Sequence, residues 1–275
     1  MSGSLLEVKD LTVTLSRQDR QIMALDKVSF SVKPGEVLGI VGESGAGKSI
    51  TGAAIINLLV PPLRRVGGTI TLAGERLDTL GPRALRSVRG GRVGFVFQDP
   101  MTSLNPVVTV GRQLTDTIRT HLRLDRDQAR RKAIDWLDRV GLPNPDLTLD
   151  RYPHQLSGGM RQRVGLARAL SVDAEVLLLD EPFSAVDEQN RRKFQEDLIR
   201  LRTTQNKTFI FVTHSIEEAV YISDRIVLLS PRPGRVSRII EPDIDRSGDP
   251  ERIHRDSHYL DTVEEIWQGL KQYVE

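Results

Sequence analysis

The chain contains no cysteine, and this absence excludes several kinds of site. Without a thiol there is no disulfide, no cysteine-ligated zinc or iron–sulfur cluster, and no thiol nucleophile. Long apolar runs are also lacking. The longest, Ile50 to Leu63, is interrupted by Pro61 and Pro62 and is shorter than the roughly 20 residues that span a bilayer. We therefore expect that the chain does not cross a membrane by itself.

The sequence also lacks a clear excess of one charge. Lysine and arginine total 39 against 37 for aspartate and glutamate, so the formal net charge is +2. This balance gives no indication of a nucleic-acid partner. The first residues carry Glu7, Lys9 and Asp10, which leaves no room for the apolar core of a secretory signal. A cytoplasmic location is expected.

What the sequence does have is an ordinary globular composition, with 275 residues, 39% hydrophobic and 28% charged. Runs rich in valine, isoleucine and phenylalanine alternate with helical patterns, as in a parallel sheet that helices cover on both faces. These runs are Val37 to Val41, Val93 to Phe97, Val176 to Leu179, Thr208 to Val212 and Ile226 to Leu229. Three shorter alternating runs predict a small antiparallel sheet, at Leu11 to Leu15, Val28 to Val32 and Thr69 to Leu72. The fold class is therefore α/β.

Two further segments complete the predicted organisation of a single domain, 1–275. Residues 99–170 are predicted to form an inserted helical subdomain, in which one helix ends at Gly141. Residues 1–98 and 171–230 would then hold the β subdomain and the parallel core, and 231–275 a C-terminal tail. The tail predicts an amphipathic packing helix whose apolar face consists of Leu260, Val263, Trp267, Leu270 and Val274.

The strand at Val37 to Val41 leads into Gly42-Glu43-Ser44-Gly45-Ala46-Gly47-Lys48-Ser49, a full match to the P-loop pattern G-x-x-x-x-G-K-[ST]. Its glycines let consecutive backbone N–H groups turn toward a triphosphate, and the helix that follows directs its positive end at the same charge. In such a loop Lys48 reaches the β and γ phosphates, and the Ser49 hydroxyl binds magnesium. The segment predicts a nucleotide-binding site.

A P-loop needs a second metal ligand, and the apolar run Val176 to Leu179 ends in Asp180 and Glu181. A carboxylate beside a nucleotide can take a proton from attacking water. The strand at Thr208 to Val212 likewise ends near His214, and Ser215 with Glu218 predicts a capping box for the next helix. Taken alone, His214 and Gln98, which follow strands, fit a structural role as well as a functional one.

The segment Leu156-Ser157-Gly158-Gly159-Met160 precedes the pattern of another helix. Serine and glycine at this place are a common N-cap arrangement, but free N–H groups at a helix start also bind phosphate. A second phosphate site suggests that nucleotide is sandwiched between two copies of the domain.

Together these segments resemble the ATP-binding subunit of an ABC transporter over nearly the whole chain. Gly42 to Ser49 match its Walker A loop, Gln98 its Q-loop, Leu156 to Met160 its signature, Val176 to Asp180 its Walker B strand, Glu181 its catalytic glutamate, Ser184 to Asp187 its D-loop and His214 its switch histidine. The resemblance implies a P-loop NTPase with a RecA-like parallel core, an antiparallel β subdomain and an inserted helical subdomain.

The resemblance also implies a set of site residues for ATP and Mg²⁺. Its catalytic residues are Glu181, His214 and Gln98, and its metal ligands are Ser49, Gln98 and Asp180. The residues that bind ATP are Gly42, Glu43, Ser44, Gly45, Ala46, Gly47, Lys48, Ser49 and Thr51. Those that reach the ATP of a partner domain are Ser157, Gly158, Gly159 and Asp187.

By the same resemblance the partners are a second nucleotide-binding domain, identical or related, two transmembrane permease subunits and, indirectly, a solute-binding protein. The location is then the cytoplasmic face of the cell membrane, as a peripheral protein. The segment from Phe97 to Pro106 resembles importers of dipeptides, oligopeptides and nickel, whereas Glu181 to Asp187 and Thr213 to Ala219 look more like nitrate, sulfonate or taurine importers. A peptide-type importer is the first hypothesis.

Three alternatives stay open: a nitrate-type importer, the motor of an exporter, and a soluble ATPase of the same type that acts on ribosomes or DNA. The last usually has two nucleotide domains in one chain or a long coiled-coil insertion, and neither is found here. One departure from the family pattern is Leu15, which stands where an aromatic residue usually stacks on adenine.

Overall fold

The protein is described here by a computed structural model that covers residues 3–17, 20–99, 103–205, 207–246 and 250–273. Two compact units make up the chain. The first unit contains residues 1–85 and 208–275, and the second unit contains residues 86–207. No helix in the described part of the chain is long and apolar enough to cross a membrane.

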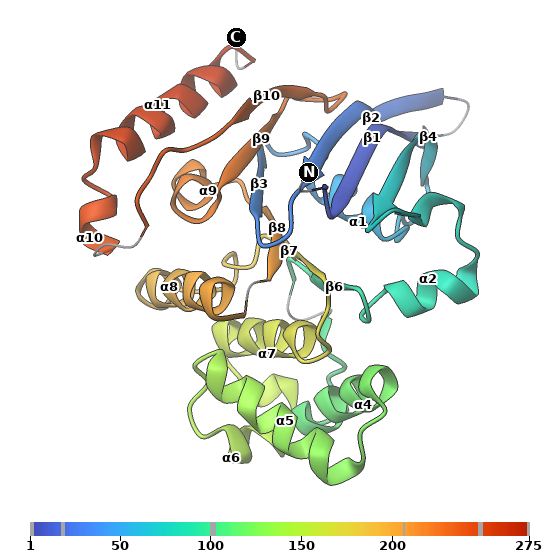
Figure 1. The fold of residues 1–275 in the computed structure, drawn as a ribbon, viewed down its shortest axis with the longest axis vertical. Helices are drawn as coiled ribbons and strands as arrows, with labels where there is room; N and C mark the ends of the chain where they lie inside the picture. Colours follow the sequence, from blue (N-terminus) through green and yellow to red (C-terminus); the bar gives the residue numbers. More distant parts are fainter. Residues whose placement is uncertain (1–2, 18–19, 100–102, 206, 247–249, 274–275) are drawn as a thin grey trace. The chain divides into compact units, whose positions relative to one another are not determined.

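The first unit holds two sheets (Figure 1). One is antiparallel with the order β2-β1-β4-β5, and its strands are β1 (Leu6–Arg17), β2 (Arg20–Val32), β4 (Leu63–Leu72) and β5 (Glu75–Arg76). The other is built on β3 (Val37–Gly42), which pairs in parallel with β8 (Thr208–Val212) and β9 (Arg225–Leu229). The strand β10 (Val236–Ile240) runs antiparallel to β9.

Burial explains why β3 and β8 are continuous apolar runs. Every residue of both strands is buried, so neither face needs a polar side chain. The first unit also contains α1 (Lys48–Ile55), η1 (Leu77–Thr79), α9 (Ile216–Ile222), α10 (Pro250–Ile253) and α11 (Ser257–Lys271), while α2 (Pro82–Val88) leads into the second unit. The parallel strands and the antiparallel sheet predicted from the sequence are confirmed.

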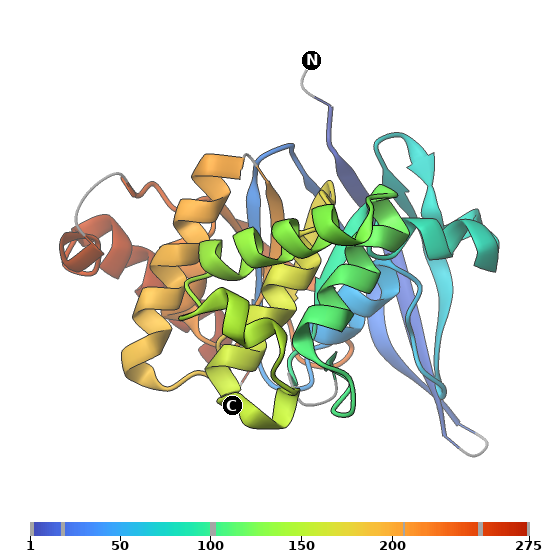
Figure 2. The same ribbon diagram turned by 90° about the horizontal axis from the view of Figure 1, so that it is seen from below.

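The second unit combines one strand pair with a group of helices (Figure 2). The strands β6 (Val93–Val96) and β7 (Val176–Asp180) are parallel. The helices are α4 (Val110–Leu122), α5 (Arg126–Arg139), α6 (Pro145–Leu149), η2 (Pro153–Gln155), α7 (Gly158–Leu170) and α8 (Glu188–Gln205). Within this unit α5 packs against α4 and α7.

The sequence predicts where α5 ends, and the structure shows how. Asp125 and Gln128 form a reciprocal capping box at its start. At its end the backbone of Gly141 has a φ of 73°, a left-handed conformation that glycine adopts without strain. The predicted helical subdomain, 99–170, covers these helices, whereas the second unit also includes β6, β7 and α8. The predicted division stays a prediction.

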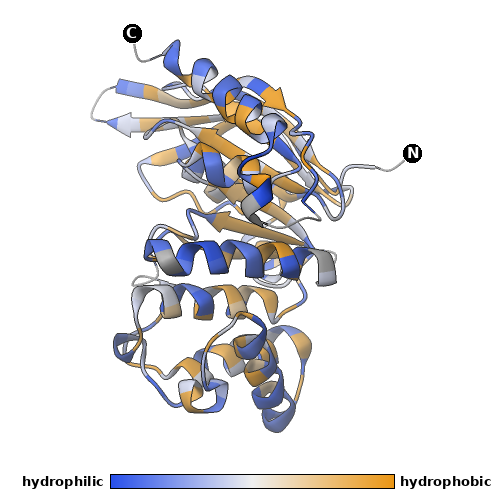
Figure 3. Ribbon diagram, turned by 90° about the vertical axis from the view of Figure 1, so that its left-hand side faces the viewer, coloured by the Kyte–Doolittle hydropathy of each residue, from blue (hydrophilic) through white to orange (hydrophobic). Residues whose placement is uncertain are grey.

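The tail helix α11 corrects one expectation. Its buried residues are Tyr259, Ile266 and Gly269, whereas Leu260 and Trp267 of the predicted packing face are 52% and 54% exposed. Val274 lies outside the described residues. The buried face lies about one residue step around the helix from the apolar stripe, because the close approach of Gly269 to Leu228 of β9 decides which side faces the core. Figure 3 shows apolar and polar residues alternating along the helices of the chain.

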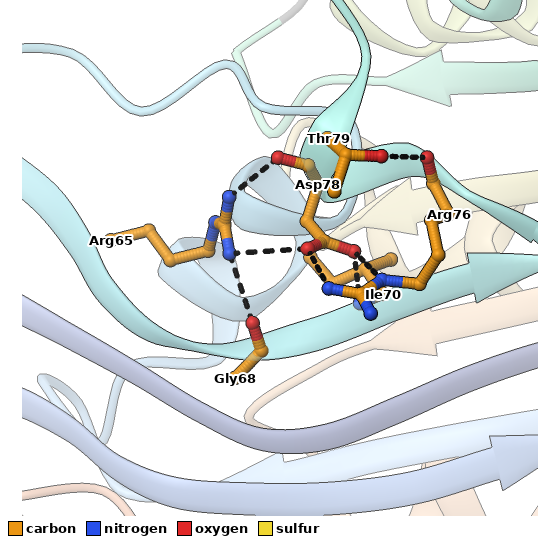
Figure 4. Close-up of polar contacts among 6 residues, drawn as sticks. All are labelled: Arg65, Gly68, Ile70, Arg76, Asp78 and Thr79. Carbon is orange, nitrogen blue, oxygen red and sulfur yellow. Dashed lines mark hydrogen bonds and ion pairs between the residues drawn. The ribbon is translucent and has the colours of Figure 1, made fainter.

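An ion-pair cluster fixes the turn after β4 (Figure 4). Asp78 accepts hydrogen bonds from Arg76 Nε at 2.8 Å and from the Ile70 backbone N–H at 3.0 Å. Arg65 donates to the Gly68 and Asp78 carbonyl oxygens, both at 2.9 Å. The hydrogen bond from Arg76 is the main cause that lowers the pKa of Asp78 to about 2.

This low pKa predicts an acid-sensitive contribution to stability. A carboxyl group whose pKa is about 2 in the fold and 3.8 in the unfolded chain stabilises the fold above pH 3.8, and the contribution is lost as the pH falls toward 2. We expect Asp78→Asn to lower the free energy of unfolding by about 1–2 kcal/mol at neutral pH. The deficit should shrink between pH 4 and pH 2. Urea unfolding of both proteins across this range measures it, and the exposed Glu241→Gln serves as control. A deficit that does not change with pH would contradict the assignment.

Candidate nucleotide-binding site

The loop between β3 and α1 has the backbone path that the P-loop pattern predicts. Gly45 and Gly47 have φ values of 82° and 94°, in the left-handed region where a side chain would be strained. A Cβ at Gly47 would also lie 2.4 Å from Leu25 Cδ2. Both positions therefore require glycine because of their backbone conformation. Gly47 requires it for a second reason, since Leu25 of β2 leaves no room for a Cβ.

Lys48 begins α1 and is only 6% exposed. Its Nζ donates to the carbonyl oxygens of Gly42 at 2.8 Å and Glu43 at 2.9 Å, so the ammonium group lies over the loop. The N-cap residue Gly47 has no side chain to satisfy the first N–H groups of α1. A buried cation and an uncapped helix start fit a phosphate group well.

Thr51, which the resemblance places in the ATP site, is fully buried. Its hydroxyl donates to the Gly47 carbonyl oxygen at 3.0 Å, and its backbone N–H donates to the same oxygen at 2.8 Å. In the structure Thr51 therefore supports the loop from within α1. A contact between Thr51 and ATP stays a prediction.

Glu181 follows the last residue of β7 and anchors a small hydrogen-bond cluster of the second unit. Gln98 Nε2 donates to Glu181 Oε2 at 2.8 Å. The Ser184 hydroxyl lies 2.9 Å from the Glu181 carbonyl oxygen and 3.2 Å from the Gln98 carbonyl oxygen. The fold thus brings together Gln98 and Glu181, two residues that are far apart in the sequence.

The backbone of Glu181 has a φ of 46°, which is uncommon for a residue with a side chain and concentrates at functional sites. The preceding residue, Asp180, is the end of β7 and is only 7% exposed. A buried carboxylate at a strand end is the donor type that magnesium prefers. The chemistry of this pair therefore fits one metal ligand and one base.

The signature segment begins α7. Ser157 is the N-cap residue, and its hydroxyl accepts the Met160 N–H at 3.2 Å. A Cβ at Gly158 would lie 2.7 Å from the Ala185 carbonyl oxygen, so the signature lies against the D-loop of the same chain. The sequence predicted the N-cap but not this contact, because nothing in the local pattern relates Gly158 to Ala185.

Asp187 in the D-loop is held by Asn190. The Asn190 side-chain nitrogen donates to both carboxylate oxygens of Asp187, at 3.0 and 2.9 Å, and its backbone N–H donates at 3.1 Å. These hydrogen bonds keep the pKa of Asp187 below its ordinary value. Asn190 was not among the predicted site residues, although an aspartate directly before a helix, as Asp187 is before α8, is a typical N-cap signal.

His214 is exposed and lies between Thr213 and Ser215, which both form hydrogen bonds with Glu218 of α9. Ser215 is the N-cap, as predicted, and its hydroxyl accepts the Glu218 N–H at 3.1 Å. In a capping box the Glu218 side chain would accept the Ser215 backbone N–H directly, but here the Thr213 hydroxyl lies between them. The Ser215 backbone N–H donates to Thr213 Oγ1 at 3.0 Å, and this hydroxyl donates to Glu218 Oε2 at 2.6 Å. The buried Thr213 hydroxyl thus links the Ser215 backbone N–H to the Glu218 carboxylate through two hydrogen bonds.

Comparison with known proteins gives the family of this chain. Residues 25–184 match the ABC transporter family, and this segment contains the P-loop, Gln98, the signature and Glu181. The chain belongs to the ABC transporter family. His214 lies beyond the matched residues.

Individual relatives of this ABC transporter protein agree with the family match. An oligopeptide transport ATP-binding protein of Bacillus subtilis is 38% identical over 82% of this chain. A dipeptide transport ATP-binding protein of Escherichia coli is 39% identical over 82%, and a putative peptide import ATP-binding protein of Brucella abortus is 40% identical over 83%. The matched part spans 63% of the Bacillus protein's length and 69% of the other two.

Solved structures show that this ABC transporter protein has the fold of an ATP-binding cassette. The cassette MJ0796, in a dimeric post-hydrolysis state bound to ADP and Pi, is 28% identical with a TM-score of 0.77. A second dimeric structure of the same cassette is 29% identical, also with a TM-score of 0.77. Each comparison covers 89% of this chain and 100% of the cassette. The α/β fold class predicted from the sequence is confirmed.

Proposed function

We propose that this chain binds and hydrolyses ATP and that the hydrolysis powers the import of peptides through an ABC transporter. The observation that carries this proposal is the match of 38–40% identity to proteins named for oligopeptide, dipeptide and peptide transport. The match extends over 226 residues or more, beyond the first half of the chain. The nitrate-type, exporter and soluble alternatives have no such support among these relatives.

The P-loop would hold the phosphates of ATP. Lys48 has its ammonium group over the loop, and the backbone N–H groups of Gly42 to Ser49 would bind the triphosphate. Ser49, Asp180 and Gln98 are the residues proposed to hold Mg²⁺. When bound, Mg²⁺ neutralises charge on the phosphate oxygens during the transfer.

Glu181 would act as the general base that takes a proton from the attacking water. In the structure one of its carboxylate oxygens, Oε2, already accepts a hydrogen bond from Gln98. That bond orients the carboxylate. His214 would sense the γ-phosphate. Ser157, Gly158, Gly159 and Asp187 would reach the ATP of a partner domain, a role supported by the dimers that the related cassette forms.

The partners proposed are a second nucleotide-binding domain, two transmembrane permease subunits and, indirectly, a solute-binding protein. The segment that begins at Phe97 supports a docking role, because Phe97 is 40% and Val107 is 78% exposed although both are apolar. Residues 100–102 of this segment lie outside the described residues. Through these partners the chain would be peripheral on the cytoplasmic face of the membrane.

Recovery of the tagged chain from mildly solubilised membranes of its native cell tests the transport function. We expect two permease subunits and a peptide-binding protein to accompany it, and a second ATPase chain if the pair is a heterodimer. ATP hydrolysis by the purified chain is measured in parallel. Recovery of the chain alone, or with ribosomes or DNA, would contradict transport while leaving the ATPase intact.

The adenine base would meet an aliphatic surface. Leu15 of β1 lies opposite Ile22 of β2 and Leu63 of β4, and opposed residues share one face of an antiparallel sheet. Val13, two residues before Leu15, pairs with Leu25, the residue whose side chain packs against Gly47 of the P-loop, and an irregularity in the β1–β2 register lies between Val13 and Thr14. The aliphatic row therefore lies within a few residues of the strand position that contacts the loop.

An aliphatic row predicts weak binding of the base, since stacking on an aromatic ring contributes about 1–3 kcal/mol per base. We expect Leu15→Tyr to tighten ATP binding by about fivefold or more. Ser16→Tyr, which places the same ring on the opposite face, is the matched control. Titration with a fluorescent ATP analogue measures both. Equal affinity for Leu15→Tyr and the unmodified protein would show that the base binds elsewhere.

A further inference from the structure

The helix after His214 is held at its carboxyl end by the tail. The guanidinium of Arg246 donates from Nε to the Tyr221 carbonyl oxygen at 2.8 Å and from Nη2 to the Val220 carbonyl oxygen at 2.9 Å. It also donates to the Ser223 carbonyl oxygen. The last carbonyl groups of a helix have no partner within it, and a cation at this end interacts favourably with the helix dipole. Arg246 therefore caps α9.

The tail also contacts the side and the start of α9. His254 stacks on Tyr221 with ring centroids 4.9 Å apart, and the ring of Tyr259 meets His254 edge-on at 5.0 Å. The Tyr259 hydroxyl donates to the Glu217 carbonyl oxygen in the first turn of α9, at 3.3 Å. Tyr259 is only 3% exposed, and burial raises its pKa. Its hydroxyl is therefore a fixed donor.

The start of α9 in turn holds the residues on both sides of His214. Glu218 Oε2 accepts the Thr213 hydroxyl at 2.6 Å, and Glu217 Oε2 accepts the Ser215 hydroxyl at 3.1 Å. His214 lies between these two anchored residues. A shift of α9 along its axis therefore moves the backbone at His214.

A seven-residue helix has little stability of its own, because a short helix barely offsets the cost of its first turn. The position of α9 therefore depends on the elements that pack against it, and α11 is one of them. Figure 1 shows α9 on the same side of the first unit as α10 and α11. The tail and β3 together therefore determine where α9 lies.

We propose that Arg246 and Tyr259 are positioning residues for His214: the tail holds α9 at both ends, and α9 holds the backbone on either side of the histidine. The inference rests on the proposed function, in which His214 senses the γ-phosphate. The tail then does more than complete the core, because it sets the geometry of a catalytic residue through one short helix.

The test measures kcat and KM for ATP in the full chain carrying Arg246→Ala, Arg246→Lys or Tyr259→Phe. We expect Arg246→Ala to lower kcat by about 10-fold, because small displacements of a catalytic group are costly, with KM changed less than about twofold. Arg246→Lys should recover part of the loss, since lysine still donates to carbonyl oxygens. Arg255→Ala removes an exposed arginine from the same tail and is the matched control.

The decisive measurement is the double variant with His214→Ala. If Arg246 acts through His214, Arg246→Ala should lower kcat much less in the His214→Ala protein than in the unmodified one. Equal losses in both backgrounds, or an unchanged kcat in Arg246→Ala, would overturn the inference. If Arg246→Ala does not fold, Tyr259→Phe, which removes one hydroxyl, is measured in the same cycle. If His214→Ala itself leaves kcat unchanged, the proposed role of His214 fails, which is a different result.

Discussion

Replacing Glu181 by glutamine is expected to lower the rate of ATP hydrolysis by about 100- to 10 000-fold. A glutamine at this position keeps an oxygen that accepts the hydrogen bond from Gln98 Nε2. The hydrogen bonds among Gln98, residue 181 and Ser184 are therefore expected to stay as they are. What the amide lacks is the ability to take a proton from water. Loss of the rate with retention of ATP binding is therefore the expected pattern.

A coupled assay for released phosphate measures the rate, and titration with a fluorescent ATP analogue measures the affinity. Glu196→Gln changes the same group on the exposed surface of α8 and should leave both values unchanged. Hydrolysis at the unmodified rate in Glu181→Gln would rule out Glu181 as the base. Loss of ATP binding together with the rate would instead show that the carboxylate holds the site together.

Replacing Lys48 by alanine is expected to weaken ATP binding by about 10- to 150-fold, the effect of losing hydrogen bonds to a charged group. Lys48 is 6% exposed, and its Nζ donates to the Gly42 and Glu43 carbonyl oxygens, which places the ammonium group over the loop. A buried cation in this place attracts phosphate more strongly than a hydrated one would. Alanine removes the charge without blocking the loop.

Calorimetric titration with ATP and Mg²⁺ measures this affinity, and the exposed Lys33→Ala controls for the change in net charge. The melting temperature in the absence of ATP should change little, while the rise in melting temperature on adding ATP should be lost. Unchanged affinity in Lys48→Ala would contradict the assignment of the P-loop as the phosphate site.

The helix termini of this protein show what short stretches of sequence predict well. Ser157 and Ser215 were predicted as N-caps and both accept an N–H from three residues ahead. The end of α5 at Gly141 and the left-handed glycines of the P-loop follow from local conformational preference in the same way. Each of these features involves residues within a few positions of one another, so the pattern contains all that is needed.

The tail helix shows where such patterns fail. Periodicity predicted a face that included Leu260 and Trp267, and both are more than half exposed. An amphipathic pattern says that a helix has an apolar side, but the contact of Gly269 with Leu228 determines how far that side is rotated. The same limit applies to the capping box of α9, where the buried Thr213 hydroxyl relays the bond between Ser215 and Glu218.

The residues alone determined the kind of chemistry of this protein, because a P-loop, an Asp-Glu pair after a buried strand and a signature segment each act through backbone and side-chain groups close in sequence. The tertiary structure alone decided which distant groups meet. It brought Gln98 to Glu181 and Gly158 to Ala185, and it placed Arg246 on the carboxyl end of α9. Such contacts join segments tens of residues apart, and they depend on packing of the whole unit, which no local pattern specifies.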